Sequence, residues 1–140
     1  MIRIKLVENE AELSEAHQIR KEVFVIEQNC PEEIEWEHEE ESKHYIAIHN
    51  NLIIGTARWR KTDNGYKLER FAVLKTNRKQ GIGSLLLKKI LSEIPSDNNT
   101  IYLHAQIAAK AFYVKHGFSP IGDNFWEGGI EHVKMYLPKE

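Results

Sequence analysis

The chain has 140 residues, of which 41% are hydrophobic and 29% are charged, a composition typical of an ordinary globular protein. The formal net charge of −2 argues against general nucleic-acid binding, which usually depends on a strongly basic domain. No apolar run approaches the roughly 20 residues of a membrane helix, no signal-peptide pattern opens the sequence, and the single cysteine, Cys30, fits a reducing compartment. We therefore expect one cytoplasmic domain over residues 1–140, with no membrane partner.

The first elements in the chain are a strand and a helix. Residues 2–6 alternate apolar and basic side chains with the period of a strand. Asn9 and Glu12 have the spacing of a capping box, which begins a helix predicted to run from residue 10 to about residue 25. The apolar face of that helix would contain Leu13, Ala16, Ile19, Val23 and Ile26.

The middle of the sequence contains three strands and a helix. Segments 45–48 and 52–59 flank Asn50 and Asn51 and predict a β-hairpin. Residues 66–74 follow a second turn as another antiparallel strand. Residues 81–94 have apolar side chains at helical spacing, and Pro95 ends that helix.

The remaining elements complete a mixed sheet. Residues 101–105 have the pattern of a strand, and residues 107–116 form a helix that Gly117 stops. Residues 118–121 and 133–137 are the closing strands, separated by a glycine loop. The order of elements predicts an α/β (α+β) fold, a sheet with helices on both faces.

The sharpest local motif is the segment from Arg78 to Ser84, which lies between a strand and a strongly amphipathic helix. Its glycines allow a ligand to approach the backbone closely. Free N–H groups and the dipole at the helix start favour an anion such as a pyrophosphate. A simple glycine turn before a helix fits the loop equally well. A Walker A loop and a dinucleotide fingerprint are both excluded by spacing, the latter because position 86 is Leu86.

Three segments resemble one protein family. Arg78-x-x-Gly81-x-Gly83 is similar to the Q/R-x-x-G-x-G/A loop of the GNAT N-acetyltransferases, and it follows the strand 68–73 as that family's loop does. Residues 111–118 resemble the family's A-x-F-Y-x-x-x-G-F segment. Residues 19–28 resemble the start of the small bacterial ElaA-like members. The resemblance covers nearly the whole chain.

The resemblance implies a fold, a co-substrate and its site. The GNAT fold has a mixed, mostly antiparallel sheet of six to seven strands, splayed between the fourth and fifth strands. Acetyl-CoA would lie in that splay and donate its acetyl group directly to a primary amine, with no metal. The residues implied at the coenzyme are Phe71, Ala72, Val73, Arg78, Lys79, Gln80, Gly81, Ile82, Gly83, Ser84, Gln106 and Phe112.

Two residues are candidates for proton transfer. Tyr113 occupies the position of the tyrosine from which the family protonates the coenzyme sulfur, although a core aromatic on a helix face is the alternative. Glu69 precedes Phe71 by two residues, so both side chains are expected on one face of the sheet. Glu69 would then be the base, or it would equally serve as the ion-pair partner of Arg70 or Arg20.

The acceptor is not identified by any motif. The segment Glu32–Glu41 contains seven glutamates and would attract a cationic amine if it lay near the site, although a charge run usually covers a solvated face. Residues 1–50 hold 13 acidic and 5 basic side chains, whereas residues 51–140 hold 8 and 14. The tentative acceptor residues are Arg20, Phe24, His104 and Trp126.

Three hypotheses of function remain open at this point. The first is an acyl-CoA-dependent N-acetyltransferase that acts on a small-molecule or peptide amine. The second is an acyl-CoA-binding protein without turnover. The third is an interaction domain that docks a basic partner through its acidic segment. A homodimer is common in the resembling family, but no segment here reports the oligomeric state.

Overall fold

The structure is a computed structural model that describes residues 1–30 and 38–139. Seven strands form one mixed sheet in the order β1-β2-β3-β4-β5-β7-β6. The strands are β1 (Ile2–Leu6), β2 (Ser42–His49), β3 (Leu52–Thr62), β4 (Gly65–Val73), β5 (Ile101–Gln106), β6 (Ser119–Glu127) and β7 (Ile130–Leu137). The helices are α1 (Glu10–Arg20), η1 (Lys21–Glu27), η2 (Lys75–Asn77), α3 (Ile82–Glu93), η3 (Ile107–Ala109) and α4 (Lys110–Lys115). This arrangement confirms the predicted α/β class.

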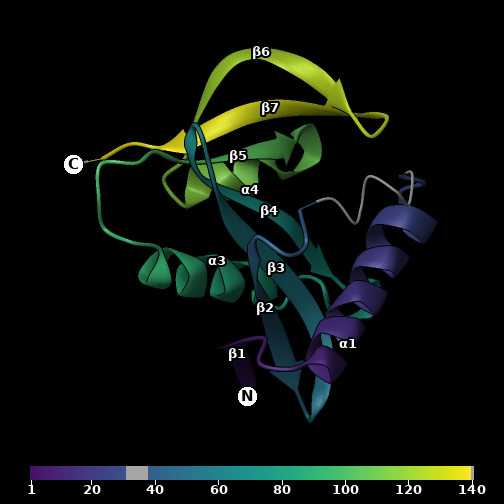
Figure 1. Ribbon diagram of the computed structural model, residues 1–140. Helices are drawn as coiled ribbons and strands as arrows, with labels where there is room; N and C mark the ends of the chain where they lie inside the picture. The colour runs from purple at the N-terminus through teal and green to yellow at the C-terminus, as the bar shows by residue number, and fades with distance from the viewer. Residues whose placement is uncertain (31–37, 140) are drawn as a thin grey trace.

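Helices cover both faces of the sheet, as Figure 1 shows for α1 and α3 on opposite sides of β2–β4. The α3 helix buries Ile82, Leu86, Leu87 and Ile90 because apolar residues recur at helical spacing on one face. These side chains pack with Leu68, Leu103 and Met135 in the main core. A smaller cluster on the other face joins Ile19, Val23 and Phe24 to Ala72 of β4.

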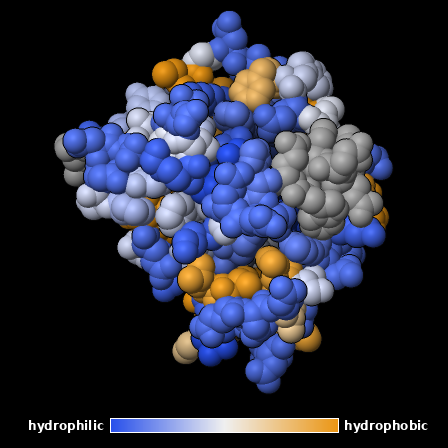
Figure 2. All heavy atoms as spheres, viewed as in Figure 1, coloured by the Kyte–Doolittle hydropathy of each residue, from blue (hydrophilic) through white to orange (hydrophobic). Residues whose placement is uncertain are grey.

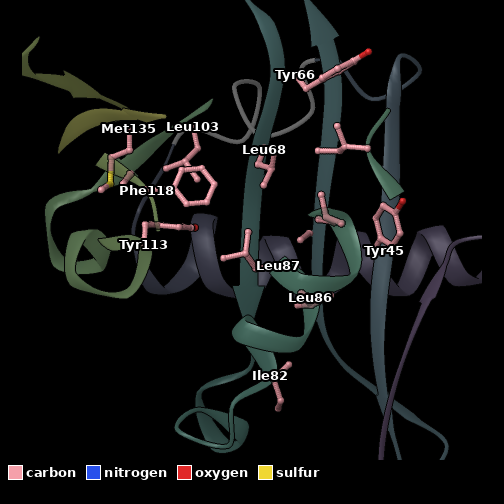
Figure 3. Packing of buried hydrophobic residues seen from close by; sticks show 14 of the residues in the cluster. Tyr45, Tyr66, Leu68, Ile82, Leu86, Leu87, Leu103, Tyr113, Phe118 and Met135 are labelled. Atoms are coloured by element: carbon pink, nitrogen blue, oxygen red, sulfur yellow. The ribbon is translucent and has the colours of Figure 1, made fainter. Parts of the chain in front are cut away.

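Tyr113 belongs to the main core at its α4 end. Figure 3 shows its ring directed from α4 toward the sheet, beside Phe118 and Leu103. The outer surface in the view of Figure 2 is mainly hydrophilic, with hydrophobic atoms in separate patches. Within the described ranges, no helix is long and apolar enough to cross a membrane.

The sheet splays between its fourth and fifth strands, as expected. The parallel pairing of β4 with β5 covers only Tyr66 with Ile101, Lys67 with Tyr102 and Leu68 with Leu103. From Glu69 to Val73, β4 pairs with no residue of β5, and the Val73 carbonyl accepts a hydrogen bond from Arg78 Nε instead. Such an unpaired strand edge can pair with an extended ligand.

The predicted helix from residue 10 to residue 25 changes type part-way. Its second half is the π-helix η1, in which the N–H of Gln28 donates to the carbonyl of Val23 over 3.1 Å. A π-turn holds more residues than an α-turn, so the buried face shifts. Phe24 is buried, whereas Ile26 is 66% exposed. The prediction that Ile26 joins the apolar face is therefore wrong.

The C-terminal elements differ in length from their predicted bounds. The segment 107–116 is a 3₁₀ turn followed by the six-residue helix α4. The strand β6 extends to Glu127 and β7 begins at Ile130, so they form a hairpin around Gly128 and Gly129, with an irregularity between Ile121 and Phe125. The strand β7 pairs with β5, and the β6 side chains of Phe125 and Glu127 reach His104 of β5.

Candidate active site

Two adjoining hollows lie along the unpaired part of β4. The larger hollow, called the main cleft below, has a volume of about 420 Å³ and includes Phe71 in its lining. The smaller hollow, called the loop pocket below, has a volume of about 310 Å³ and is lined by Val73 and most of the segment 78–84. Tyr113 lines the main cleft and its neighbour Phe112 lines the loop pocket, so α4 borders both.

A β-bulge shapes the middle of β4. Arg58 pairs with Glu69 and Thr56 pairs with Ala72, so β4 holds one more residue than β3 across this interval. The extra residue is Arg70, whose φ of 59° lies in the left-handed region. Neither Arg70 nor Phe71 has a ladder partner on β3 in this register. The bulge therefore presents backbone groups at the floor of the splay.

The bulge also separates Glu69 from Phe71. Leu68 and Phe71 both pack on the main core, with the Phe71 ring 6.0 Å from the Tyr113 ring. Glu69 instead contacts Arg58 on the face that carries α1. The expectation that Glu69 and Phe71 share one face is wrong, because Arg70 adds a residue to the alternation of side chains.

The glycine loop has the geometry of an anion site. Gly81 has a φ of 77° and immediately precedes α3, and a Cβ at this position would meet no atom within 4 Å. Gly83 lies against α4, since its Cβ would come within 3.4 Å of the Phe112 ring. The N–H groups of the first turn of α3 thus face open space, where the helix dipole favours negative charge.

Four side chains supply charge or hydrogen-bonding groups around the loop pocket. Ser84 Oγ lies 3.1 Å from His116 Nε2, and Lys79 and Lys115 line the same pocket. The pKa of His116 is lowered by partial burial and by the neighbouring Lys88 and Lys115. Lys115 and His116 come from α4 and its C-terminal end, more than thirty positions beyond the loop in the sequence.

The side chain of Arg78 forms an ion pair with Glu27 of η1. Its two terminal nitrogens donate to Glu27 Oε1 and Oε2, each over 2.7 Å, and its Nε donates to the carbonyl of Val73 over 2.9 Å. The pair lowers the pKa of Glu27. Arg78 thus links η1 to the end of β4, and its charge is already partly balanced beside the loop.

Tyr113 is a buried phenol at the junction of the two hollows. Its ring contacts Phe71, Phe112 and Phe118, with centroids 5.0–6.0 Å apart. Burial raises the pKa of Tyr113 above its ordinary value. The phenol therefore remains protonated at neutral pH, which is the state that a proton donor requires.

Glu69 lies among three cations on the wall of the main cleft. Its Oε1 accepts from Arg58 Nε over 3.1 Å and from Arg60 Nε over 2.7 Å, and its Oε2 is 3.4 Å from Lys67 Nζ. Burial alone would raise the pKa of Glu69, but these cations lower it to about 2. At neutral pH the carboxylate is ionised and is a weak base.

The opposite wall carries a histidine–carboxylate pair. His104 Nδ1 is 3.2 Å from Glu127 Oε2, and the His104 ring packs edge-on against Phe125. Nearby, Gln106 of β5 donates to Gln28 over 2.9 Å, which joins β5 to the end of η1. His104, Gln106 and Phe24 all line the main cleft.

Four predicted site residues are placed elsewhere. Arg20 is 1% exposed and forms an ion pair with Glu39 over 2.5 Å, outside the lining of both hollows. Trp126 is 71% exposed on β6 and lines neither hollow. The Ala72 side chain packs on the smaller core cluster, and Gln80 is exposed outside both linings.

Part of the expected acceptor region is outside the described residues. Of the acidic segment Glu32–Glu41, residues 32–37 are not described, and Glu39 bridges Arg20 and Arg58. Within residues 1–30 and 38–139, no three His, Cys, Asp or Glu side chains come together as metal ligands do.

Comparison with known proteins identifies the family. Residues 7–138 match the family described as an acetyltransferase (GNAT) domain. The chain belongs to the GNAT acetyltransferase family. It is 38% identical to the uncharacterized N-acetyltransferase YjcF of Bacillus subtilis over 134 residues, which cover 93% of this chain and 95% of YjcF.

Solved structures agree with this GNAT assignment. The crystal structure of Escherichia coli ElaA has a TM-score of 0.84 and 26% sequence identity, and the match covers 99% of this chain and 100% of ElaA. An aminoglycoside 6'-N-acetyltransferase complexed with coenzyme A has a TM-score of 0.77 at 16% identity, with 99% of both chains covered. The latter likeness shows the GNAT fold alone.

The GNAT loop and tyrosine motifs located the two hollows, but several lining residues were missed. Lys115 and His116 adjoin the Phe112–Tyr113 motif, so the motif itself offered a signal for them. Arg58, Arg60 and Lys67 gave no such signal, because their convergence on Glu69 depends on the pairing of β3 with β4.

Proposed function

We propose that this GNAT acetyltransferase transfers an acetyl group directly from acetyl-CoA to a primary amine held in the main cleft. The observation that carries the proposal is the path that the two hollows mark along β4: Phe71 and Tyr113 line the main cleft, and Val73 and Phe112 line the loop pocket. A coenzyme lying on this path would have its pyrophosphate at one end and its thioester at the other.

The coenzyme would be held mainly by backbone groups. The loop 78–84 and the start of α3 would receive the pyrophosphate, with Lys79, Ser84 and Lys115 adding side-chain donors. The pantetheine arm would pair with the backbone of Phe71–Val73 as an added strand. A backbone N–H at the Arg70 bulge would then donate to the thioester oxygen as negative charge develops there.

Tyr113 would supply the proton that the departing thiolate needs. In direct transfer the amine nitrogen attacks the thioester carbon, the carbon–sulfur bond breaks, and the sulfur leaves with the electron pair. An ordinary thiol has a pKa of about 8.5, below the value of about 10 for a phenol, so the transfer is uphill and requires the phenol to donate a hydrogen bond to the sulfur as negative charge develops there. Burial raises the pKa of Tyr113, so the phenol is protonated at neutral pH and can donate this hydrogen bond.

The attacking amine must lose a proton on the other side of the reaction. Glu69 was the first candidate base, but its three cationic neighbours make it a poor proton acceptor. His104 is the better candidate, because it lines the main cleft and a neutral imidazole has one ring nitrogen that can accept a proton. Hydrogen bonding of its Nδ1 to Glu127 leaves Nε2 to accept the proton. We assign Glu69 to the electrostatics of the cleft and His104 to the base.

Calorimetric titration with acetyl-CoA, coenzyme A and ATP tests the coenzyme half of the proposal. We expect both coenzymes to bind alike and ATP to bind much more weakly. A panel of primary amines would then be screened for release of free thiol. Binding without any thiol release would support a coenzyme-binding protein, and binding of none of the three would support an interaction domain.

A further inference from the structure

Three cations on one wall of the main cleft share a single carboxylate. Arg58, Arg60 and Lys67 all contact Glu69 within 3.4 Å. Among the described residues, Glu69 is the only carboxylate within ion-pair distance of Arg60 and of Lys67. Arg58 has a second acidic partner, Glu39, at 2.6 Å from its Nη1, and Lys67 also interacts electrostatically with Glu127, which lines the same cleft. This wall therefore carries more positive than negative charge.

Arg60 has unused donors and lines the cleft. Arg60 uses only its Nε on Glu69, so its two terminal nitrogens make no hydrogen bond with any described residue. Arg58 is 1% exposed and its Nη2 lies 2.9 Å from Glu69 Oε1, so the donors left for a ligand are those of Arg60 and Lys67. Both residues and Lys67 line the main cleft. A guanidinium group presents paired donors that match the two oxygens of a carboxylate.

We propose that the acceptor is a primary amine that also carries a carboxylate, and that Arg60, with Lys67, binds that carboxylate. This inference rests on the proposed amine acetylation and names its substrate class. Lys67 lies four positions before Phe71 on β4, roughly 13 Å along a strand, and Arg60 is its cross-strand partner on β3. Since an arginine side chain spans part of that distance, the carboxylate and the amine of the acceptor are separated by several bonds.

Four simple amines separate this proposal from its alternatives. Pentylamine is the reference, ε-aminocaproate adds a carboxylate at the far end, norleucine adds one beside the amine, and cadaverine replaces the far carboxylate by an ammonium group. We expect kcat/KM for ε-aminocaproate to exceed that for pentylamine by about tenfold or more, the factor that one hydrogen-bonded charge pair contributes. Norleucine is expected to resemble pentylamine, and cadaverine to fall below it.

A matched pair of variants tests the residue assignment. Arg60→Gln should reduce the ratio of ε-aminocaproate to pentylamine turnover about tenfold, because the side chain loses its charge at the binding nitrogens. Lys61→Gln removes the same charge from the neighbouring, exposed position and should leave that ratio unchanged. If Arg60→Gln does not fold, the comparison of the four amines on the unmodified protein still decides the substrate class.

The outcomes distinguish this inference from the proposed function. Turnover that favours pentylamine or cadaverine over ε-aminocaproate would refute the carboxylate site and leave acetyl transfer intact. Absence of acetyl transfer to all four amines would refute the proposed function. In that case, saturation-transfer NMR on the complex with coenzyme A would compare binding of ε-aminocaproate and pentylamine. Preferential binding of ε-aminocaproate would support the site, and equal binding would refute it.

Discussion

Replacing Glu69 by Gln should destabilise the folded protein in a way that depends on pH. The carboxylate is 12% exposed and holds Arg58, Arg60 and Lys67 together, so the substitution leaves three cations without their shared partner. The ordinary pKa of 4.5 is lowered to about 2 in the folded state. At about 1.4 kcal/mol per pKa unit, the ionised carboxylate contributes on the order of 3 kcal/mol at neutral pH.

The sign of the pH dependence follows from the direction of the shift. A carboxyl whose folded-state pKa is lowered stabilises the protein above its unfolded pKa, and this stabilisation is lost as the pH falls toward the folded pKa. The stabilisation from Glu69 should therefore be complete above about pH 5. It should shrink to roughly 1–1.5 kcal/mol at pH 3, which lies between the ordinary pKa of 4.5 and the folded-state pKa of about 2.

Urea denaturation at several pH values measures this effect. The unfolding free energies of the unmodified protein and Glu69→Gln should differ by about 3 kcal/mol at pH 7 and by much less at pH 3. Glu15→Gln, on the exposed surface of α1, is the control and should show little difference at either pH. An equal difference at both pH values would refute the reasoning, because the loss would then come from packing and not from the ionised carboxylate.

Three further predictions concern the coenzyme and the reaction. Gly81→Val should weaken acetyl-CoA binding, measured by calorimetry, about tenfold or more, because its side chain would fill the open space at the loop. Gly122→Val is the control: it carries a similar left-handed backbone strain outside the site and should bind acetyl-CoA normally. Tyr113→Phe should lower kcat by about 100-fold or more with little change in coenzyme affinity. Tyr136→Phe is the matched control. Unchanged turnover in Tyr113→Phe would show that Tyr113 is not the acid. Glu27→Gln should release Arg78 toward the pyrophosphate and tighten coenzyme binding at low salt, with a smaller gain at high salt; weaker binding would show that the pair supports the loop.

The features predicted correctly are those set by short-range patterns. The amphipathic spacing from Ile82 to Ile90 located α3, and the glycines of the loop stand at its start, because helix periodicity and backbone freedom are local properties. The resemblance of the Phe112–Tyr113 motif placed the phenol at the junction of the two hollows. Both depend on residues that are close together in the sequence.

The features that were missed depend on tertiary contacts. The π-turn at Val23 and Phe24 and the bulge at Arg70 each add one residue to a regular element, and no local signal in the sequence marks where. A single added residue moved Ile26 to the surface and placed Glu69 on the opposite face from Phe71. The ion pair of Glu69 with Arg58 spans eleven positions, and it replaced the pairs predicted with Arg70 or Arg20.

Direct acetyl transfer is the central claim, and isotope tracing in a single turnover tests it most directly. The protein would be mixed in excess with acetyl-CoA that carries a deuterated acetyl group and with ε-aminocaproate or pentylamine. Mass spectrometry would follow the label on the coenzyme, the amine and the protein. We predict that the label passes from the coenzyme to the amine and never appears on the protein. Label on the protein before the amine, or label that stays on the coenzyme with every amine tested, would contradict the account.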